Sequence, residues 1–232
     1  MLMNIVLILV SWLVLWLVYK KHIGVLGLMP TAKRLKQFLV GFLITSTCCV
    51  LYFHLVAMVE NDKWKLNGAI TVKTVLASIL WVTNSVLFEE LIFRGALLYI
   101  LIRKIGKTKA ILISAAAFGI FHWVNLGIWG NLIPMIYIFL LTATWGVMFA
   151  WAFAITGSLY LPFALHFGWN LFNIVVFSSG PLRDQLLIRV KTGAHQDMNL
   201  GYSIVLLLLQ LLLAPAILYL AARKTNLVKG KP

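Results

Sequence analysis

Long apolar runs separated by short polar connections restrict the fold of this sequence more than any other feature. A helix crosses the hydrocarbon core of a membrane, about 30 Å thick, with roughly 20 apolar residues. Only 11% of the residues are charged, while 62% are hydrophobic. The sequence therefore predicts an all-α, polytopic transmembrane helix bundle of about seven spans, within a range of six to eight. The expected spans are residues 1–19, 37–59, 69–103, 110–129, 132–155, 159–179 and 201–222.

Basic residues between these runs predict the orientation of the chain. A formal net charge of +14 would suggest nucleic acid in a soluble protein. Here the Lys and Arg residues flank membrane spans, so we expect membrane lipids, and no nucleic acid, as their partners. They concentrate after the first, third and last runs, which puts the N-terminus outside and the C-terminus in the cytoplasm. Residues 1–232 are expected to form a single integral membrane domain.

Three residues of the second run, Cys48, Cys49 and His54, are expected to have no catalytic role. Adjacent cysteines cannot bridge without strained geometry, and small buried thiols pack well among apolar groups. His54 has no polar partner at helical spacing, so we expect a packing or interfacial residue.

The third run contains the charged residues Glu89, Glu90 and Arg94. As one helix, residues 69–103 would be about 50 Å long, so we expect this segment to tilt, kink or project from the membrane. An ionised group at the centre of a membrane helix costs about 2.5 to 3.5 kcal/mol, which a partner must offset. Glu90 and Arg94 are four residues apart and are expected to form an ion pair. Glu89 points about 100° away and is expected to face a cavity.

Histidines and amides interrupt two later runs. His122 lies in the fourth, and His166, Asn170 and Asn173 form a polar stripe at i, i+4 and i+7 in the sixth. On the predicted topology Glu89, His122 and His166 all lie in or near the cytoplasmic half of their spans. We therefore expect these three residues to share one cavity.

At these positions the sequence resembles the CPBP family of intramembrane proteases. This family includes prenyl-protein CAAX endopeptidases and bacterial Abi-like immunity and bacteriocin-processing relatives. Its pattern is Glu-Glu-x-x-x-Arg, then Phe-x-x-x-His, then His-x-x-x-Asn, each in a membrane helix. The matching residues, in order, are Glu89, Glu90, Arg94, Phe118, His122, His166 and Asn170. The resemblance covers residues 75–180, where we expect the protease-like core.

The resemblance implies a CAAX-type membrane protease, a hydrolase that carries out intramembrane proteolysis. Glu89 would be the general base on a water molecule that His122 helps to hold. His166 and Asn170 would stabilise the oxyanion that forms at the peptide carbonyl. Structural support would come from Glu90 and Arg94. The substrate would be a peptide or lipidated protein of the CAAX type or of the leader and bacteriocin type, and no residue selects between them.

Three other functions remain open from the sequence. Glu89, His122 and His166 also form the ligand set of a hydrolytic zinc site, which would give a metalloprotease-like enzyme. We nevertheless expect no cofactor, because Asn170 is a good oxyanion donor and a poor zinc ligand. Buried carboxylates and histidines also occur in proton-coupled transport proteins, but the sequence lacks the internal repeat usual in such folds. A non-catalytic immunity or binding protein would keep the fold without the reaction.

Overall fold

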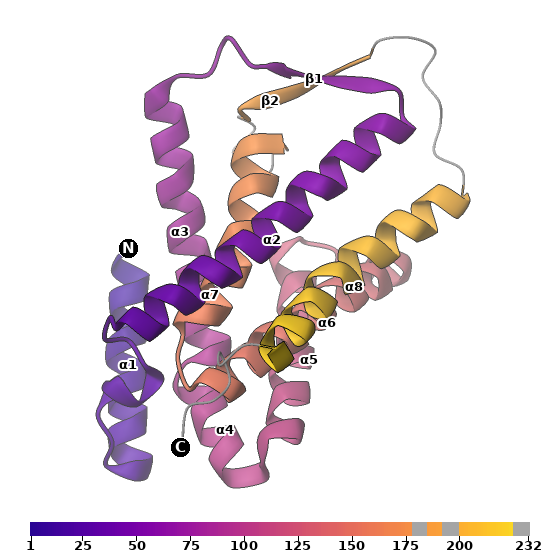
Figure 1. Cartoon of the computed structure of the whole chain (residues 1–232). Helices are drawn as coiled ribbons and strands as arrows, with labels where there is room; N and C mark the ends of the chain where they lie inside the picture. Colours follow the sequence, from indigo (N-terminus) through magenta and orange to yellow (C-terminus); the bar gives the residue numbers. More distant parts are fainter. Residues whose placement is uncertain (178–184, 192–199, 225–232) are drawn as a thin grey trace.

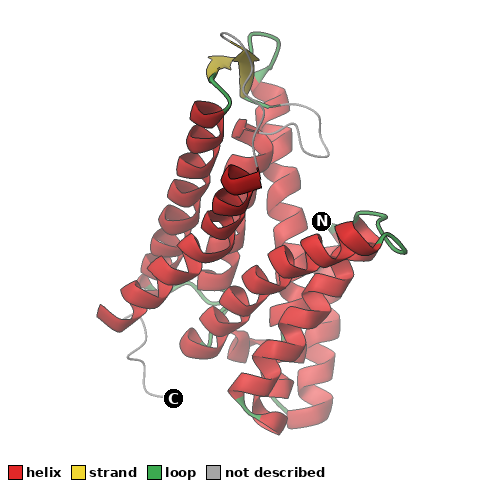
Figure 2. Ribbon diagram, turned by 90° about the vertical axis from the view of Figure 1, so that its right-hand side faces the viewer, coloured by secondary structure: helices red, strands yellow, loops and turns green. Residues whose placement is uncertain are grey.

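A computed structural model describes residues 1–177, 185–191 and 200–224. Helices make up most of this part of the chain, as the sequence predicts, with one small sheet at the end of the bundle (Figure 1, Figure 2). The helices are α1 (Leu2–Tyr19), η1 (Ile23–Leu26), α2 (Ala32–Val59), α3 (Val72–Arg94), α4 (Ala96–Ile105), α5 (Lys107–Asn125), α6 (Leu132–Thr156), α7 (Tyr160–Asn170), η2 (Leu171–Phe177) and α8 (Leu200–Lys224).

Successive long helices run alternately up and down the bundle (Figure 1). Five helical segments are long and apolar enough to cross a membrane, namely α1, α2, α6, the continuous Tyr160–Phe177 and α8. Helices α3 and α5, which lie outside this set, carry Glu89, Glu90, Arg94 and His122. The expected all-α membrane bundle is therefore confirmed, and the predicted site is divided between α3 and α5 and the apolar segment Tyr160–Phe177, which carries His166 and Asn170.

Gly95 breaks the long third run into α3 and α4. A Cβ atom at this position would lie 2.2 Å from the carbonyl oxygen of Leu91 in the preceding turn, so no other residue fits without a shift of the backbone. Of the three expected outcomes, a tilt, a kink or a projection from the membrane, the structure shows a kink, and it falls directly after Arg94. The end of α1 and the turn between α4 and α5 lie at the end of the bundle opposite the sheet (Figure 1).

Helices α2 and α7 pack closely because Gly168 has no side chain. A Cβ atom on Gly168 would lie 2.5 Å from Oγ1 of Thr45 and 2.7 Å from the carbonyl oxygen of Phe42. Gly168 is two residues from His166, so this contact between helices also fixes the height of that imidazole in the bundle. Cys48 and Cys49 are buried and free in the same helix α2, which confirms the expectation of packing residues.

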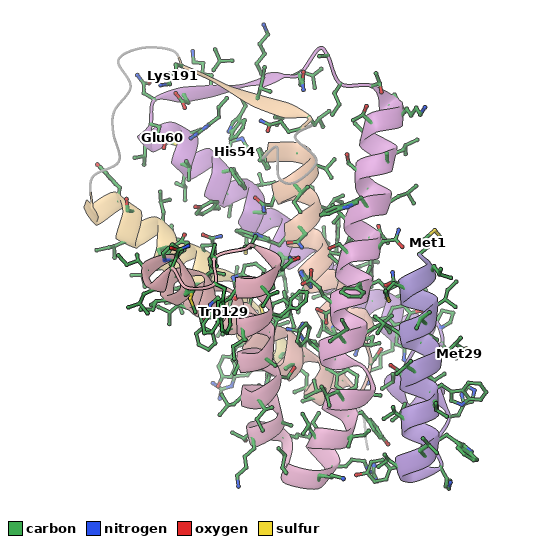
Figure 3. All side chains as sticks on the ribbon, turned by 180° about the vertical axis from the view of Figure 1, so that it is seen from behind. Met1, Met29, His54, Glu60, Trp129 and Lys191 are labelled. Atoms are coloured by element: carbon green, nitrogen blue, oxygen red, sulfur yellow. The ribbon has the colours of Figure 1, made fainter. Side chains whose placement is uncertain are left out.

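Two short strands, β1 (Asp62–Leu66) and β2 (Leu187–Lys191), pair antiparallel and connect α2 with the segment after α7. Both segments were expected from the sequence to be polar connections, and no strand was predicted in either of them. Arg189 of β2 contacts the carboxylate of Glu60, and its Nε lies 3.6 Å from Oδ2 of Asp62. Figure 3 places Glu60 and Lys191 at this end of the molecule.

The sixth expected span, 159–179, is not one regular helix. It begins as α7 and continues as the π-helix η2, which is wider than an α-helix. Residues 178–179 of that span, most of the expected connection at 181–200 and the tail after residue 224 lie outside the described residues.

Candidate active site

Helix α3 directs its two glutamates to different surroundings, as their 100° separation predicts. Nη1 of Arg94 donates a hydrogen bond to Oε1 of Glu90 over 3.1 Å, and both side chains are buried. The predicted ion pair is therefore confirmed. Glu89 lines a cavity between the helices instead.

Arg94 is held inside the protein by more than its carboxylate partner. Nη2 lies 3.4 Å from the carbonyl oxygen of Gly146 on α6. The guanidinium carbon lies 4.2 Å from the ring centroid of Phe118 and 5.0 Å from that of Phe149. Contacts of this kind between a cation and aromatic faces strengthen where water is excluded. Arg94 thus joins α3, α5 and α6 behind the cavity.

His166 of α7 contacts the same glutamate oxygen as Arg94. Its Nδ1 lies 2.9 Å from Oε1 of Glu90, and its ring stacks on Phe149 at 4.7 Å between centroids. The sequence did not predict this bond, and Glu90 was expected to give structural support only. Because a carboxylate only accepts, Nδ1 of His166 carries the hydrogen, and Nε2 is the atom that faces the cavity.

His122 of α5 has the same arrangement with a different partner. Its Nδ1 donates to the carbonyl oxygen of Phe118 over 2.8 Å, since a carbonyl can only accept. Its Nε2 lies 4.0 Å from Oε2 of Glu89, and Nε2 of His166 lies 3.8 Å from that same oxygen. The structure therefore brings the three residues to one point, as their depth in the helices indicated.

Three hydrogen-bond acceptors face one another at the point where Glu89, His122 and His166 meet. In neutral rings both Nε2 atoms are acceptors, and Oε2 of Glu89 is a buried acceptor without a hydrogen-bond partner. Three acceptors facing one another require a donor between them. A water molecule suits this position, because it can donate hydrogen bonds to buried acceptors that lack a partner.

The cavity has a volume of about 240 Å³ and a second, neutral polar wall. This wall consists of three carboxamides, Asn170 at the end of α7, Asn173 in η2 and Gln210 in α8. Asn170 lies where the sequence placed it, among the site residues, and Asn173 shares its cavity. Gln210 was missed, because a lone glutamine in an apolar run carries no motif.

His54 lies apart from this cavity. It sits near the sheet end of α2 (Figure 3), where its Nδ1 contacts the carbonyl oxygen of Val50 and its ring lies edge-on to Phe177. The expectation of a packing or interfacial histidine is confirmed.

The zinc alternative depends on how the possible donor atoms are placed. Two imidazole nitrogens and one carboxylate have the right chemistry for zinc. Within residues 1–177, 185–191 and 200–224, however, no three His, Cys, Asp or Glu side chains are arranged to hold a metal ion. The two Nε2 atoms lie 3.8 and 4.0 Å from Oε2 of Glu89. Ligands that share one tetrahedral zinc lie about 3.3 Å apart, given bonds of roughly 2 Å.

Comparison with known proteins places one segment of the chain in a family. Residues 71–172 match the model of the family described as Type II CAAX prenyl endopeptidase Rce1-like. The matched segment contains Glu89, His122, His166 and Asn170, while Gln210 lies beyond it. Neither the curated proteins nor the solved structures give a significant match to the chain.

Proposed function

We propose that this chain, whose residues 71–172 match the Rce1-like family of type II CAAX prenyl endopeptidases, is an intramembrane endopeptidase whose Glu89 activates the attacking water. The family implies protease activity, and the apolar helices make the chain an integral membrane protein. The proposal rests above all on one observation. Two imidazoles from separate helices approach the buried carboxylate of Glu89 within 3.8 and 4.0 Å, inside a cavity that can hold water.

The proposed reaction begins with a water molecule between Glu89 and His122. Glu89 takes one proton from the water while the water oxygen attacks the carbonyl carbon of the scissile peptide bond. Nε2 of His122 accepts the hydrogen bond of the second hydrogen and so orients the nucleophile. Because Nδ1 of His122 is bonded to a backbone carbonyl, its Nε2 is free to act as this acceptor.

Bond formation leaves negative charge on the former carbonyl oxygen. The amide of Asn170 and a protonated His166 donate hydrogen bonds to this oxyanion. Glu90 supports the positive charge of His166 through its bond to Nδ1, which is 2.9 Å long. When the carbonyl re-forms, the C–N bond breaks and Glu89 transfers its proton to the leaving nitrogen. The glutamate is then ionised again.

The proposed substrate is a prenylated protein with a C-terminal CAAX sequence. The family description names this substrate class, and the membrane position of the site suits a lipid-modified peptide. A leader or bacteriocin-type peptide is the second substrate class to assay. We propose that the N-terminus lies outside and the C-terminus in the cytoplasm, because the basic connections after α1 and α4 lie at the end of the bundle opposite the sheet (Figure 1).

A cleavage assay with farnesylated CAAX, unmodified CAAX and leader peptides in liposomes tests the proposal. Glu89→Gln, His122→Ala and His166→Ala are each expected to lose nearly all turnover while they still fold. His54→Ala is the matched control, since it removes a histidine outside the cavity. Full turnover in all three site variants would exclude the proposed enzyme, and would leave a scaffold or a carrier as the function.

Metal dependence needs its own measurement. We propose a metal-free reaction, so turnover should survive chelator treatment, and purified protein should contain less than stoichiometric zinc by elemental analysis. Loss of turnover on chelation, with recovery on added zinc, would replace the proposed mechanism with the metal-dependent one.

A further inference from the structure

Gln210 is the most unusual residue of the last helix. It lies in the middle of α8 among leucines, in a segment beyond the family match. The carbonyl oxygen of its backbone accepts a hydrogen bond from Nε1 of Trp145 over 3.0 Å, which attaches α8 to α6 at the height of the site. Its side chain has no hydrogen bond to any other described residue. A carboxamide in a membrane helix is costly without such a partner.

Three hollows of the molecule meet at this residue. The first is the cavity of Glu89 and the histidines. The second is an apolar hollow between α2, α6 and α8, lined among others by Leu51, Leu55 and Leu213. The third lies between Tyr52, Tyr137 and α8. Gln210 lines all three, so its side chain stands where the polar cavity opens toward apolar space next to α8.

The chemistry of a peptide inside a membrane indicates what Gln210 binds. Every backbone N–H and C=O group of such a peptide needs a hydrogen-bond partner, because water and lipid tails supply none in the core. Glu89 and His122 offer acceptors. A carboxamide offers both an acceptor oxygen and N–H donors, which match the N–H and C=O of one residue in an extended peptide, because these two groups point to the same side.

We infer that Gln210 binds the backbone N–H and C=O of one substrate residue by paired hydrogen bonds, at the border between the catalytic cavity and the hollow beside Tyr52 and Tyr137. This inference rests on the proposed function and names the residue that holds its substrate. In this position the peptide extends from the Glu89 cavity toward the hollow of about 370 Å³ beside Tyr52 and Tyr137, because the apolar hollow of about 10 Å³ is too small for a side chain. Gln210 is a substrate-binding residue and takes no part in proton transfer.

Binding to the Glu89→Gln variant separates this inference from the cleavage reaction. Fluorescent forms of the farnesylated CAAX, unmodified CAAX and leader peptides are titrated into this variant in detergent, and the tightest binder is used thereafter. Adding Gln210→Leu is expected to weaken its Kd about tenfold or more, the effect of losing a pair of buried hydrogen bonds. Gln210→Asn, which keeps the amide on a shorter side chain, should lose less. Leu208→Ala, on the lipid-facing side of α8, should leave the Kd unchanged.

Turnover and stability give the second measurement. In the otherwise native chain, Gln210→Leu should raise KM about tenfold and keep kcat within about twofold, because the contact exists before and during the reaction. Its melting temperature should stay equal or rise, since leucine suits an apolar helix better than an unpaired amide. A structural glutamine would instead lower the melting temperature.

Three results would overturn the inference. They are an unchanged Kd in Gln210→Leu, a lowered melting temperature that accounts for the weaker binding, and failure of all three peptides to bind the Glu89→Gln variant. If a peptide binds through Gln210 and the native chain does not cleave it, the proposed function fails and the inference stands.

Discussion

Two clusters in this chain combine an arginine with two carboxylates, and their surroundings differ. In the membrane helices, Arg94 pairs with Glu90 at 3.1 Å, and their side chains are 0% and 1% exposed. At the sheet, the side chain of Arg189 is 39% exposed and contacts both Glu60 and Asp62. An arginine and two carboxylates therefore occur once with a fully buried arginine and once with a partly exposed one, beside acids whose side chains are 11% and 4% exposed.

The two clusters differ in whether one of their carboxylates remains without a cationic partner. Arg94 has its ion pair with Glu90, and Glu89 is left to face the cavity and the histidines. Arg189 contacts both of its acids, so neither is left for chemistry. A lone carboxylate in low dielectric interacts strongly with any nearby proton, whereas water and salt weaken charges at an exposed pair. Matched substitutions in the two clusters test this reading.

The largest contrast is expected between Glu89→Gln and Glu60→Gln. Glu89→Gln should lower kcat about 10²- to 10⁴-fold, the usual contribution of a general base, with little change in melting temperature. Glu60→Gln should leave kcat unchanged. Initial rates with the farnesylated peptide measure both. Equal losses in the two variants would mean that Glu89 has no special place in the reaction.

The next contrast concerns the arginines. Arg94→Leu leaves Glu90 buried without its cation and should destabilise the protein by about 3 to 5 kcal/mol. Arg189→Leu should cost less than Arg94→Leu, because Arg189 is 39% exposed and solvent screens its charge, even though Glu60 and Asp62 are largely buried. Thermal unfolding in detergent measures both. A second comparison removes both charges, since Glu90→Leu with Arg94→Leu should recover much of the lost stability without restoring turnover.

A smaller effect is expected from Glu90→Gln. Glutamine still accepts the N–H of His166, but it no longer supports a positive imidazole, so kcat should fall about 10- to 100-fold. If kcat stays at the native value while the melting temperature drops, the glutamate supports only the fold. Steady-state rates at constant folded fraction, checked by size-exclusion chromatography, decide between these outcomes.

The smallest effect is expected at the sheet. Asp62→Asn should change the free energy of unfolding by about 1 kcal/mol, and part of the change should vanish near 1 M salt, because Arg189 is 39% exposed although Asp62 is 4% exposed. The destabilisation by Arg94→Leu should persist at the same salt concentration. Unfolding curves at low and high salt compare the two. A salt-resistant loss in Asp62→Asn would show that the sheet cluster is as dry as the one in the membrane.

The sequence predicted those parts of the site that depend on helix geometry. The Glu90–Arg94 pair follows from four-residue spacing, and the separate direction of Glu89 follows from helical rotation. The bond from His166 to Glu90 joins residues 76 positions apart, and no local pattern signals it. The family resemblance supplied the roles that spacing alone does not give, and these roles stay predictions.

Other features of the structure could not be predicted from the sequence, for physical reasons. The strands β1 and β2 are short and polar, and they form only because the chain brings distant segments together at one end of the bundle. A tilt, kink or projection of the third run was expected. The position of the kink at Gly95 depends on a close contact with Leu91 that only the three-dimensional structure shows. Gln210 belongs to no sequence motif. Its proposed role depends on the cavities that it lines, and the sequence does not show these cavities.

One oxygen atom, Oε1 of Glu90, receives both the guanidinium of Arg94 and the imidazole of His166. The buried ion pair of α3 and the proposed catalytic imidazole therefore share one acceptor atom. Protein engineers who seek a more thermostable form should leave α3 untouched and work on the lipid-facing side of α1 or on the sheet. Repacking around Arg94 would turn the ring of His166 and change the reaction along with the fold.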